Sequence, residues 1–162
     1  MDVPQYILDR YSSNVTLCAD IMYVNGIPFF VAISRHIKCI SVVAAKSMNK
    51  ATLLACIDKV INVYKHRGFT VTNMNMDNAF EYLRGDLTGG QRNIDINIVA
   101  ANEHEPTIER CIRHIKDRCR CAVAAAAFKQ MPRRLTTELV NTMVYWINSV
   151  PRIDGIHPVL SP

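Results

Sequence analysis

The sequence lacks the features that would place it in a specialised class of protein. No apolar run approaches the roughly 20 residues of a membrane-spanning helix, so we expect no membrane contact. The opening MDVPQYILDR mixes charged and apolar side chains and is not a secretory signal pattern. No repeat or long low-complexity linker divides the chain. We therefore expect one domain over residues 1–162, with 1–13 as a lead-in and 151–162 as an irregular tail.

The cysteines form neither a disulfide framework nor a zinc pattern. Four of the six lie inside apolar stretches, where a free thiol behaves as a small hydrophobic side chain. We therefore expect a reducing, intracellular environment. Cysteine and histidine do gather between residues 104 and 121, but their spacing matches no zinc finger, and Cys119 and Cys121 would point about 200° apart on one helix.

The chain is rich in hydrophobic residues and carries an excess of basic ones. The chain is 49% hydrophobic, which is typical of a globular protein, and its 19 lysine and arginine residues give a formal charge of +5. An excess of positive charge suits a polyanionic partner but does not require one.

Apolar periodicity predicts three strands followed by alternating helices and strands. Asn25 and Gly26 are a hairpin signal, while Asn49 and Gly68 are a helix cap and a helix stop. The expected strands are 14–24, 28–34, 37–43, 69–76 and 94–100, and the expected helices are 48–68, 107–128 and 135–150, with a short helix or turn in 77–90. This order predicts an α/β protein of ribonuclease H-like architecture: a mixed five-stranded sheet, three antiparallel strands and then two parallel ones, flanked by helices.

The expected helix 107–128 carries two stripes. One is apolar and repeats at helical spacing: Ile108, Ile112, Ile115 and Cys119. The other lies about 100° round the helix and starts with a carboxylate that three cations follow: Glu109, Arg113, Lys116 and Arg120. Glu109 is either a simple ion-pair partner of Arg113, worth a few tenths of a kcal/mol, or part of a metal-binding carboxylate set. In the second case the cations, which we call the basic stripe, are placed for phosphate.

Three carboxylates occupy positions that this topology would bring together. Asp20 interrupts an apolar strand, where a carboxylate is costly unless it is paired or metal-bound. Asp77 follows the expected fourth strand, at the carboxyl edge where α/β sites form. If the first and fourth strands are neighbours, these two residues are adjacent, and the helix after the fifth strand can bring Glu109 to them. Oxygen ligands without histidine or cysteine favour Mg²⁺ or Mn²⁺ over zinc.

Each carboxylate also has a purely structural interpretation. Asp20 can be satisfied by a nearby arginine or backbone donor, and Asp77 can cap the following turn. Glu109 can be an ordinary first-turn acid that the helix dipole favours. Only the coincidence of all three in one topology favours a two-metal site.

Four blocks stand in order along the chain: CADIMYVNGIPFFVAISR, MNMDNAFEYLRG, IERCIRHIKDR and LVNTMVYWINSVPRIDGIHPVLSP. They resemble successive blocks of the integrase catalytic core of copia-type retrotransposons, within the retroviral integrase superfamily. DNAFEY is similar to that family's DNGGEF, and IERCIR is similar to its VERKNR. The resemblance covers nearly the whole chain, about 15 to 162.

The resemblance implies a function. Asp20, Asp77 and Glu109 would form a D,D,E triad that holds two Mg²⁺ or Mn²⁺ ions and catalyses phosphodiester cleavage and DNA strand transfer. Arg113 and Lys116 match helix positions that contact DNA in the family, and Arg120 continues the row. The implied partners are the DNA ends of the element, a target duplex, and further copies of the chain in a homodimer or higher oligomer. The implied location is nuclear when the protein acts on chromosomal DNA.

The sequence departs from the family pattern at several points. Ala79 and Phe80 replace the paired glycines, Ile112 replaces an asparagine, and the segment between the second and third acids is short. Glu103 and Glu105 are rival third ligands, but only Glu109 precedes the basic stripe. We count as accessory site residues Asn78, His104 and Glu105.

Two other functions remain open. A ribonuclease H-like nuclease would use the same triad to cut RNA or DNA without joining ends. A decayed or domesticated element would only bind nucleic acid or a partner.

Overall fold

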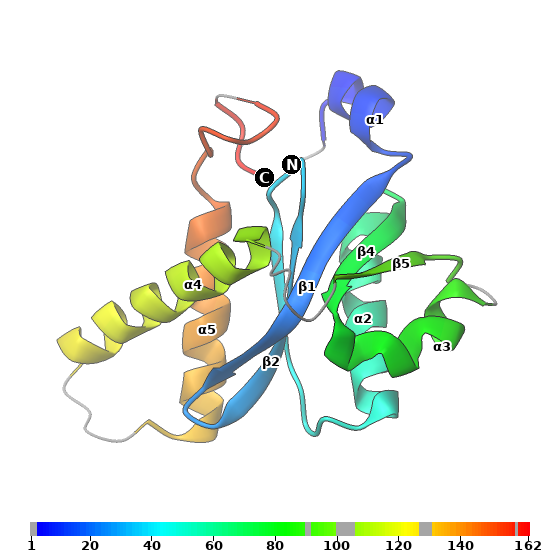
Figure 1. The fold of residues 1–162 in the computed structure, drawn as a ribbon. Coiled ribbons are helices and arrows are strands. Elements are labelled where there is room, and N and C mark those ends of the chain that lie inside the picture. Colours follow the sequence, from blue (N-terminus) through cyan, green and yellow to red (C-terminus); the bar gives the residue numbers. More distant parts are fainter. Residues whose placement is uncertain (1–2, 90–91, 100–105, 127–130, 158) are drawn as a thin grey trace.

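The computed structural model describes residues 3–89, 92–99, 106–126, 131–157 and 159–162. Figure 1 shows the sheet and the helices around it. In chain order the elements are α1 (Gln5–Tyr11), β1 (Val15–Val24), β2 (Ile27–Ser34), β3 (Ile40–Ala44), α2 (Lys50–Lys65), β4 (Val71–Asp77), the 3₁₀ helix η1 (Asn78–Leu83), α3 (Arg84–Thr88), β5 (Asp95–Val99), α4 (Pro106–Ala125) and α5 (Arg133–Asn148).

The sheet has the predicted mixed topology. Its strand order is β3-β2-β1-β4-β5. The pairs β1–β2 and β2–β3 are antiparallel, while β1–β4 and β4–β5 are parallel. The predicted fold class, a ribonuclease H-like mixed sheet flanked by helices, is therefore confirmed.

Local signals explain how the early elements form. Asn25 and Gly26 both take positive φ angles, 48° and 72°, which is the conformation of a tight hairpin turn between β1 and β2. Asn49 caps α2 by accepting a 2.8 Å hydrogen bond from the Thr52 N–H. Gly68 adopts a φ of 82° just beyond that helix. These predicted turn and cap residues act where the sequence placed them.

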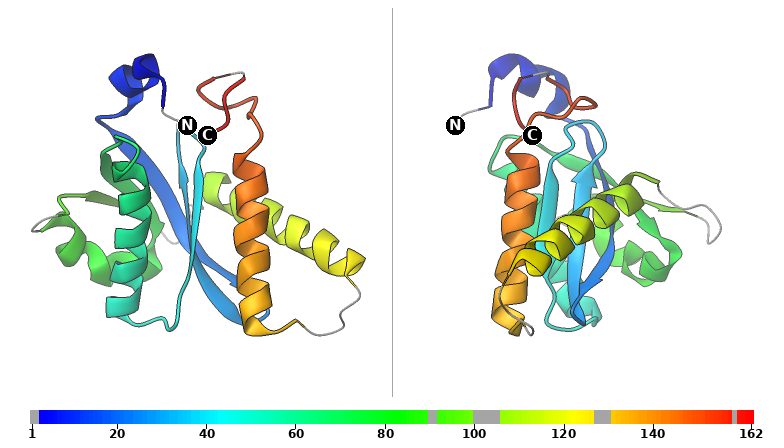
Figure 2. Two further views of the ribbon diagram at one scale, coloured as in Figure 1. Left: turned by 180° about the vertical axis from the view of Figure 1, so that it is seen from behind. Right: turned by 90° about the vertical axis from the view of Figure 1, so that its left-hand side faces the viewer.

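Helices cover the two faces of the sheet differently. Figure 2 shows α2 and α3 on one side and α4 and α5 on the other. A hydrophobic core lies on each face of the sheet, and alternate residues of β1 belong to one or the other. Leu17 and Ala19 pack on the α2 side, and Cys18 and Met22 pack on the side of α4 and α5. Asp20 falls on the α4 side of this alternation.

Two local features differ from the sequence-based predictions. The lead-in contains the helix α1, which buries Ile7; seven residues are too few for helical periodicity to stand out. The third strand begins at Ile40 rather than at residue 37, because the chain first turns at Lys38, whose φ is 65°.

The six cysteines are all free thiols, and only Cys121 is exposed. Within the described ranges, no helix is long and apolar enough to cross a membrane.

Candidate active site

Strand register sets Asp20 beside Asp77. In the parallel pair β1–β4, Cys18 lies opposite Asn75 and Ala19 opposite Met76. The next position along both strands is occupied by the two aspartates. The predicted site requires β1 and β4 to be neighbours, and they are paired in parallel.

The two aspartates have different surroundings. Asp20 is half-buried, and its Oδ1 accepts a 2.6 Å hydrogen bond from the Ile21 N–H. Asp77 is exposed at the end of β4 and caps η1, with Oδ1 accepting a 2.6 Å bond from the Asn78 N–H. The structural interpretation of Asp77 as a turn cap is thus realised. A cap of this kind engages one carboxylate oxygen, and a carboxylate has two, so capping and cation binding are compatible.

Glu109 reaches this region because α4 packs obliquely across the sheet. The helix buries Ile108, Cys111, Ile115 and Cys119 against the core that β1 and β2 share with α5. Cys111 was not predicted in this face, whereas the predicted Ile112 is only half-buried. The packing leaves Glu109 exposed in the first turn, on the flank of α4 that faces Asp20.

Asp77 and Glu109 lie within electrostatic reach of Asp20. Burial raises the pKa of Asp20 above the ordinary value of 3.8, and the hydrogen bond from Ile21 opposes this rise. The negative charges of Asp77 and Glu109 raise the pKa further, whereas the positive charge of Lys116 lowers it. The fold therefore gathers the three acids around a half-buried position where negative charge is disfavoured.

The donor set fits a hard divalent cation in its chemistry. It consists of carboxylate oxygens, which Mg²⁺ and Mn²⁺ prefer. In the described part of the chain, however, no three acidic, histidine or cysteine side chains converge closely enough to enclose an ion. Asp20, Asp77 and Glu109 are neighbours here without forming a closed ligand set.

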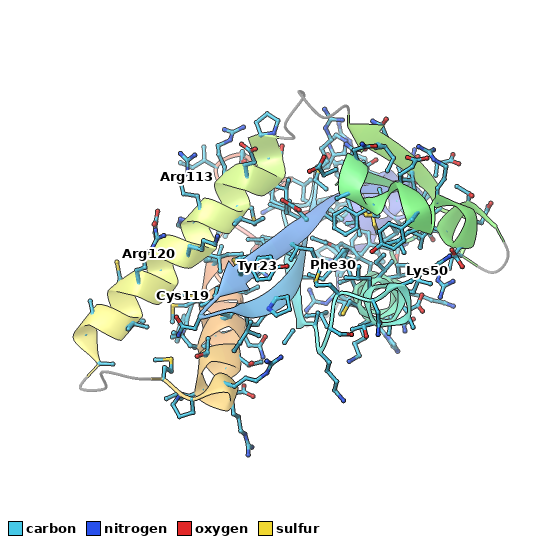
Figure 3. All side chains as sticks on the ribbon, turned by 60° about the horizontal axis from the view of Figure 1, so that its bottom comes forward. Tyr23, Phe30, Lys50, Arg113, Cys119 and Arg120 are labelled. Atoms are coloured by element: carbon cyan, nitrogen blue, oxygen red, sulfur yellow. The ribbon has the colours of Figure 1, made fainter. Side chains whose placement is uncertain are left out.

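The basic stripe is less uniform than its spacing suggested. Figure 3 shows Arg113 and Arg120 along the outer side of α4. Arg113 is exposed, while Lys116 is half-buried and acts on Asp20. Arg120 forms a 2.8 Å ion pair with Asp117, an exposed residue that lies outside the stripe. Arg113 therefore differs from the other two cations of the stripe. It is exposed, and it forms no ion pair with any residue that the structure describes.

The accessory residues have mixed outcomes. Asn78 is exposed at the start of η1 and touches the site through its backbone N–H on Asp77. His104, Glu105 and the rival Glu103 lie outside the described residues.

Asn75, the polar residue of β4 two positions before Asp77, was not among the predicted site residues. It is buried, lies on the same strand face as Asp77, and its Nδ2 is 3.9 Å from the Cys18 Sγ. Register places the polar residues of β5 on the same face, so Asn73, Asn75 and Asp77 face the same way as Asp95 and Asn97. The alternation of asparagine with methionine in NMNMD was the signal that could have found this row.

Comparison with known proteins bears on the fold. No family model matches the chain, and no curated protein matches it by sequence. The catalytic core domain of BIV integrase superposes with a TM-score of 0.65 at 15% identity, covering 91% of this chain and 90% of that one. The HTLV-2 integrase catalytic core domain in complex with magnesium, in a trimeric form, gives 0.64 at 16% identity, covering 85% and 87%. The chain has the fold of a retroviral integrase catalytic core. At 15% and 16% sequence identity, this similarity concerns the fold alone.

Proposed function

We propose that this protein is the catalytic core of a retrotransposon-type integrase, of the copia type, which cleaves phosphodiesters and transfers DNA strands with the help of divalent metal. One observation carries the proposal. The fold is that of an integrase core, and in it Asp20 and Asp77 lie next to each other on the paired parallel strands β1 and β4. Glu109 on α4 lies within electrostatic reach of Asp20. The four sequence blocks support the retrotransposon type.

Asp20, Asp77 and Glu109 would hold two Mg²⁺ or Mn²⁺ ions. The chemistry that such ions supply is a lower pKa for the attacking water or 3′-hydroxyl and stabilisation of charge on the leaving oxygen. The residues themselves favour cation binding, because burial and mutual repulsion disfavour the charge of Asp20 until a cation is near. A similar core binds magnesium, which supports this choice of ion.

DNA is the proposed polyanion. Arg113, Lys116 and Arg120 would contact backbone phosphates of the element ends and the target duplex, which gives salt-sensitive binding with little sequence preference. The formal charge of +5 agrees with this role. We place the protein inside the cell, in the nucleus when it acts on chromosomal DNA.

A second copy of the chain is the proposed protein partner, in a homodimer or higher oligomer. A groove runs between α2 and α5 over β3, and Val63 and Tyr145 line it with 44% and 66% of their surface exposed. Val63 and Tyr145 are exposed on the same groove, and apolar side chains grouped in this way are typical of interaction surfaces. Sedimentation velocity should show self-association that Tyr145→Glu weakens at least tenfold; an unchanged association constant would exclude this face.

The test of the proposed function is a joining assay. It uses a labelled duplex with a recessed 3′-hydroxyl, a target duplex and Mn²⁺. Glu109→Gln keeps the shape of the side chain and removes the charge that a hard ion requires, so cleavage and joining should both disappear. Glu105→Gln and the exposed Glu138→Gln on α5, a matched control, should retain activity.

The products separate the alternatives. Loss of activity in Glu105→Gln with full activity in Glu109→Gln would show that the third acid is wrongly assigned. Cleaved strands without joined product would instead identify a nuclease, and no metal-dependent product in the wild type would identify a binding domain.

A further inference from the structure

A second concave site lies on the other flank of α4, away from the three carboxylates. It is a cleft of about 740 Å³ between α4 and the C-terminal half of α5, which cross obliquely in Figure 2. Arg110, His114 and Arg118 line it at one-turn spacing. These positions centre about 140° round the helix from Glu109, so the cleft and the proposed active site use opposite flanks of α4.

The floor of the cleft is apolar. It is formed by Ile33, Ile40, Cys111, Met143 and Ile147. Trp146 stands at its side with 60% of its surface exposed, packed edge-on against Tyr145 at a ring-centroid distance of 5.8 Å. A half-open tryptophan beside an apolar depression is typical of an interaction site rather than of ordinary surface.

The rim of the cleft is basic. Four cations, Lys38, Arg110, Arg118 and Arg152, face a single carboxylate, Asp154. Asp154 pairs with Lys38 at 3.5 Å and with Arg152 at 3.0 Å. Arg110 and Arg118 are exposed and form no ion pair among the described residues. The rim therefore keeps uncompensated positive charge directly above an apolar floor.

We propose that this cleft binds an acidic, amphipathic peptide segment of a partner protein. The basic rim selects carboxylates, and the floor selects apolar side chains that arrive with them, as when an amphipathic helix enters a groove. A nucleic acid duplex would use mainly the rim, because protein–DNA interfaces are more polar than protein–protein interfaces and its phosphates would leave the apolar floor uncovered. A simple anion would leave the floor unused for the same reason.

Trp146 makes the proposal directly measurable. It is the only tryptophan in the chain, so tryptophan fluorescence reports on the surroundings of this one side chain at the cleft. The probe is a capped synthetic peptide with leucine and phenylalanine on one helical face and glutamate on the other. Two matched peptides have the same residues in scrambled order, or lysine in place of every glutamate. The acidic amphipathic peptide should give a saturable fluorescence change, the scrambled peptide should bind at least tenfold more weakly, and the lysine peptide should give no change.

Charge-reversal variants connect the signal to the rim. Arg110→Glu with Arg118→Glu should weaken peptide binding at least tenfold. The matched control, Arg35→Glu with Arg134→Glu, makes the same charge change at exposed positions outside the cleft and should bind as the wild type does. Thermal melts of both variants check that they fold.

Three results would overturn the proposal. One is the lack of a saturable change with the acidic amphipathic peptide. Another is equal weakening in the two double variants. The third is a saturable change of the same size with an oligothymidylate or with inorganic phosphate, which would make the cleft a general anion site. None of these readouts depends on metal or on the carboxylates near Asp20.

Discussion

The carboxylate of Asp20 is held where its charge is disfavoured. Burial is the main cause, and the charges of Asp77 and Glu109 add to it, so the pKa of Asp20 is raised. A raised pKa means that the folded protein binds a proton more tightly than the unfolded chain. The contribution to stability is then fully present below pH 3.8 and is lost as the pH rises through the raised pKa.

Asp20→Asn should therefore stabilise the metal-free protein in a pH-dependent manner. The variant has no charge to lose, so its gain in unfolding free energy over the wild type should grow as the pH rises from below 3.8 towards neutrality. Chemical denaturation at a series of pH values, with chelator present, measures this difference. Glu138→Gln is the control and should follow the wild-type curve. Parallel curves for Asp20→Asn and wild type would show that burial and repulsion do not act on Asp20.

At the scale of the element, α4 presents three different faces. Its apolar face, with Ile115 at the centre, anchors the helix on β1 and β2. One flank brings Glu109 and Lys116 towards Asp20, and the opposite flank lines the basic cleft beside α5. A single amphipathic helix can therefore separate the two proposed sites, because its side chains project at 100° intervals.

Within the basic stripe, Arg113→Ala combined with Lys116→Ala should weaken duplex binding about equally for unrelated sequences. The slope of log K against log salt should flatten by up to about two phosphate contacts. Fluorescence anisotropy at several salt concentrations gives both quantities. The matched control replaces two cations off this flank, Arg35→Ala with Arg134→Ala, and should leave the slope in place. A slope that stays the same in Arg113→Ala with Lys116→Ala would remove the stripe from the DNA-binding surface.

At the scale of the whole molecule, the crossover from β3 through α2 to β4 brings Asp77 next to Asp20. It returns the chain to the middle of the sheet, next to β1, rather than to its edge. Asp20 and Asp77 are 57 positions apart in the sequence, yet the parallel register sets them side by side. The next crossover leads from β5 to α4 and delivers Glu109. Asp20 and Asp77 therefore become neighbours only when β1 pairs with β4, and Glu109 approaches them only when α4 packs on the sheet.

A metal bound by this assembled site should stabilise the whole fold. At ten times its dissociation constant the ion contributes about 1.4 kcal/mol, which corresponds to a rise of a few degrees in melting temperature. Asp77→Asn should keep the cap on η1, because asparagine caps nearly as well as aspartate, but should lose most of the metal-dependent rise. Thermal melts with and without about 10 mM MnCl₂ test this expectation. Equal shifts in the two proteins would exclude Asp77 from the metal site.

The sequence by itself determined the features that depend on near neighbours. Alternation in β1, the Asn25–Gly26 turn and the Asn49 cap are local patterns, and each appears where it was predicted. The periodicity of α4 predicted three of its four buried residues, Ile108, Ile115 and Cys119. Their order along the chain was enough to predict the mixed five-stranded sheet, because connections between such elements have few allowed arrangements.

Only the tertiary structure decided which side chains are buried, paired or exposed where one element packs on another. It half-buried Lys116 near Asp20, paired Arg120 with Asp117, buried Asn75 beside Cys18 and opened the basic cleft between α4 and α5. Each of these depends on the angle and depth at which one element packs on another. That geometry is set by the summed packing of many distant side chains, so no short stretch of sequence encodes it.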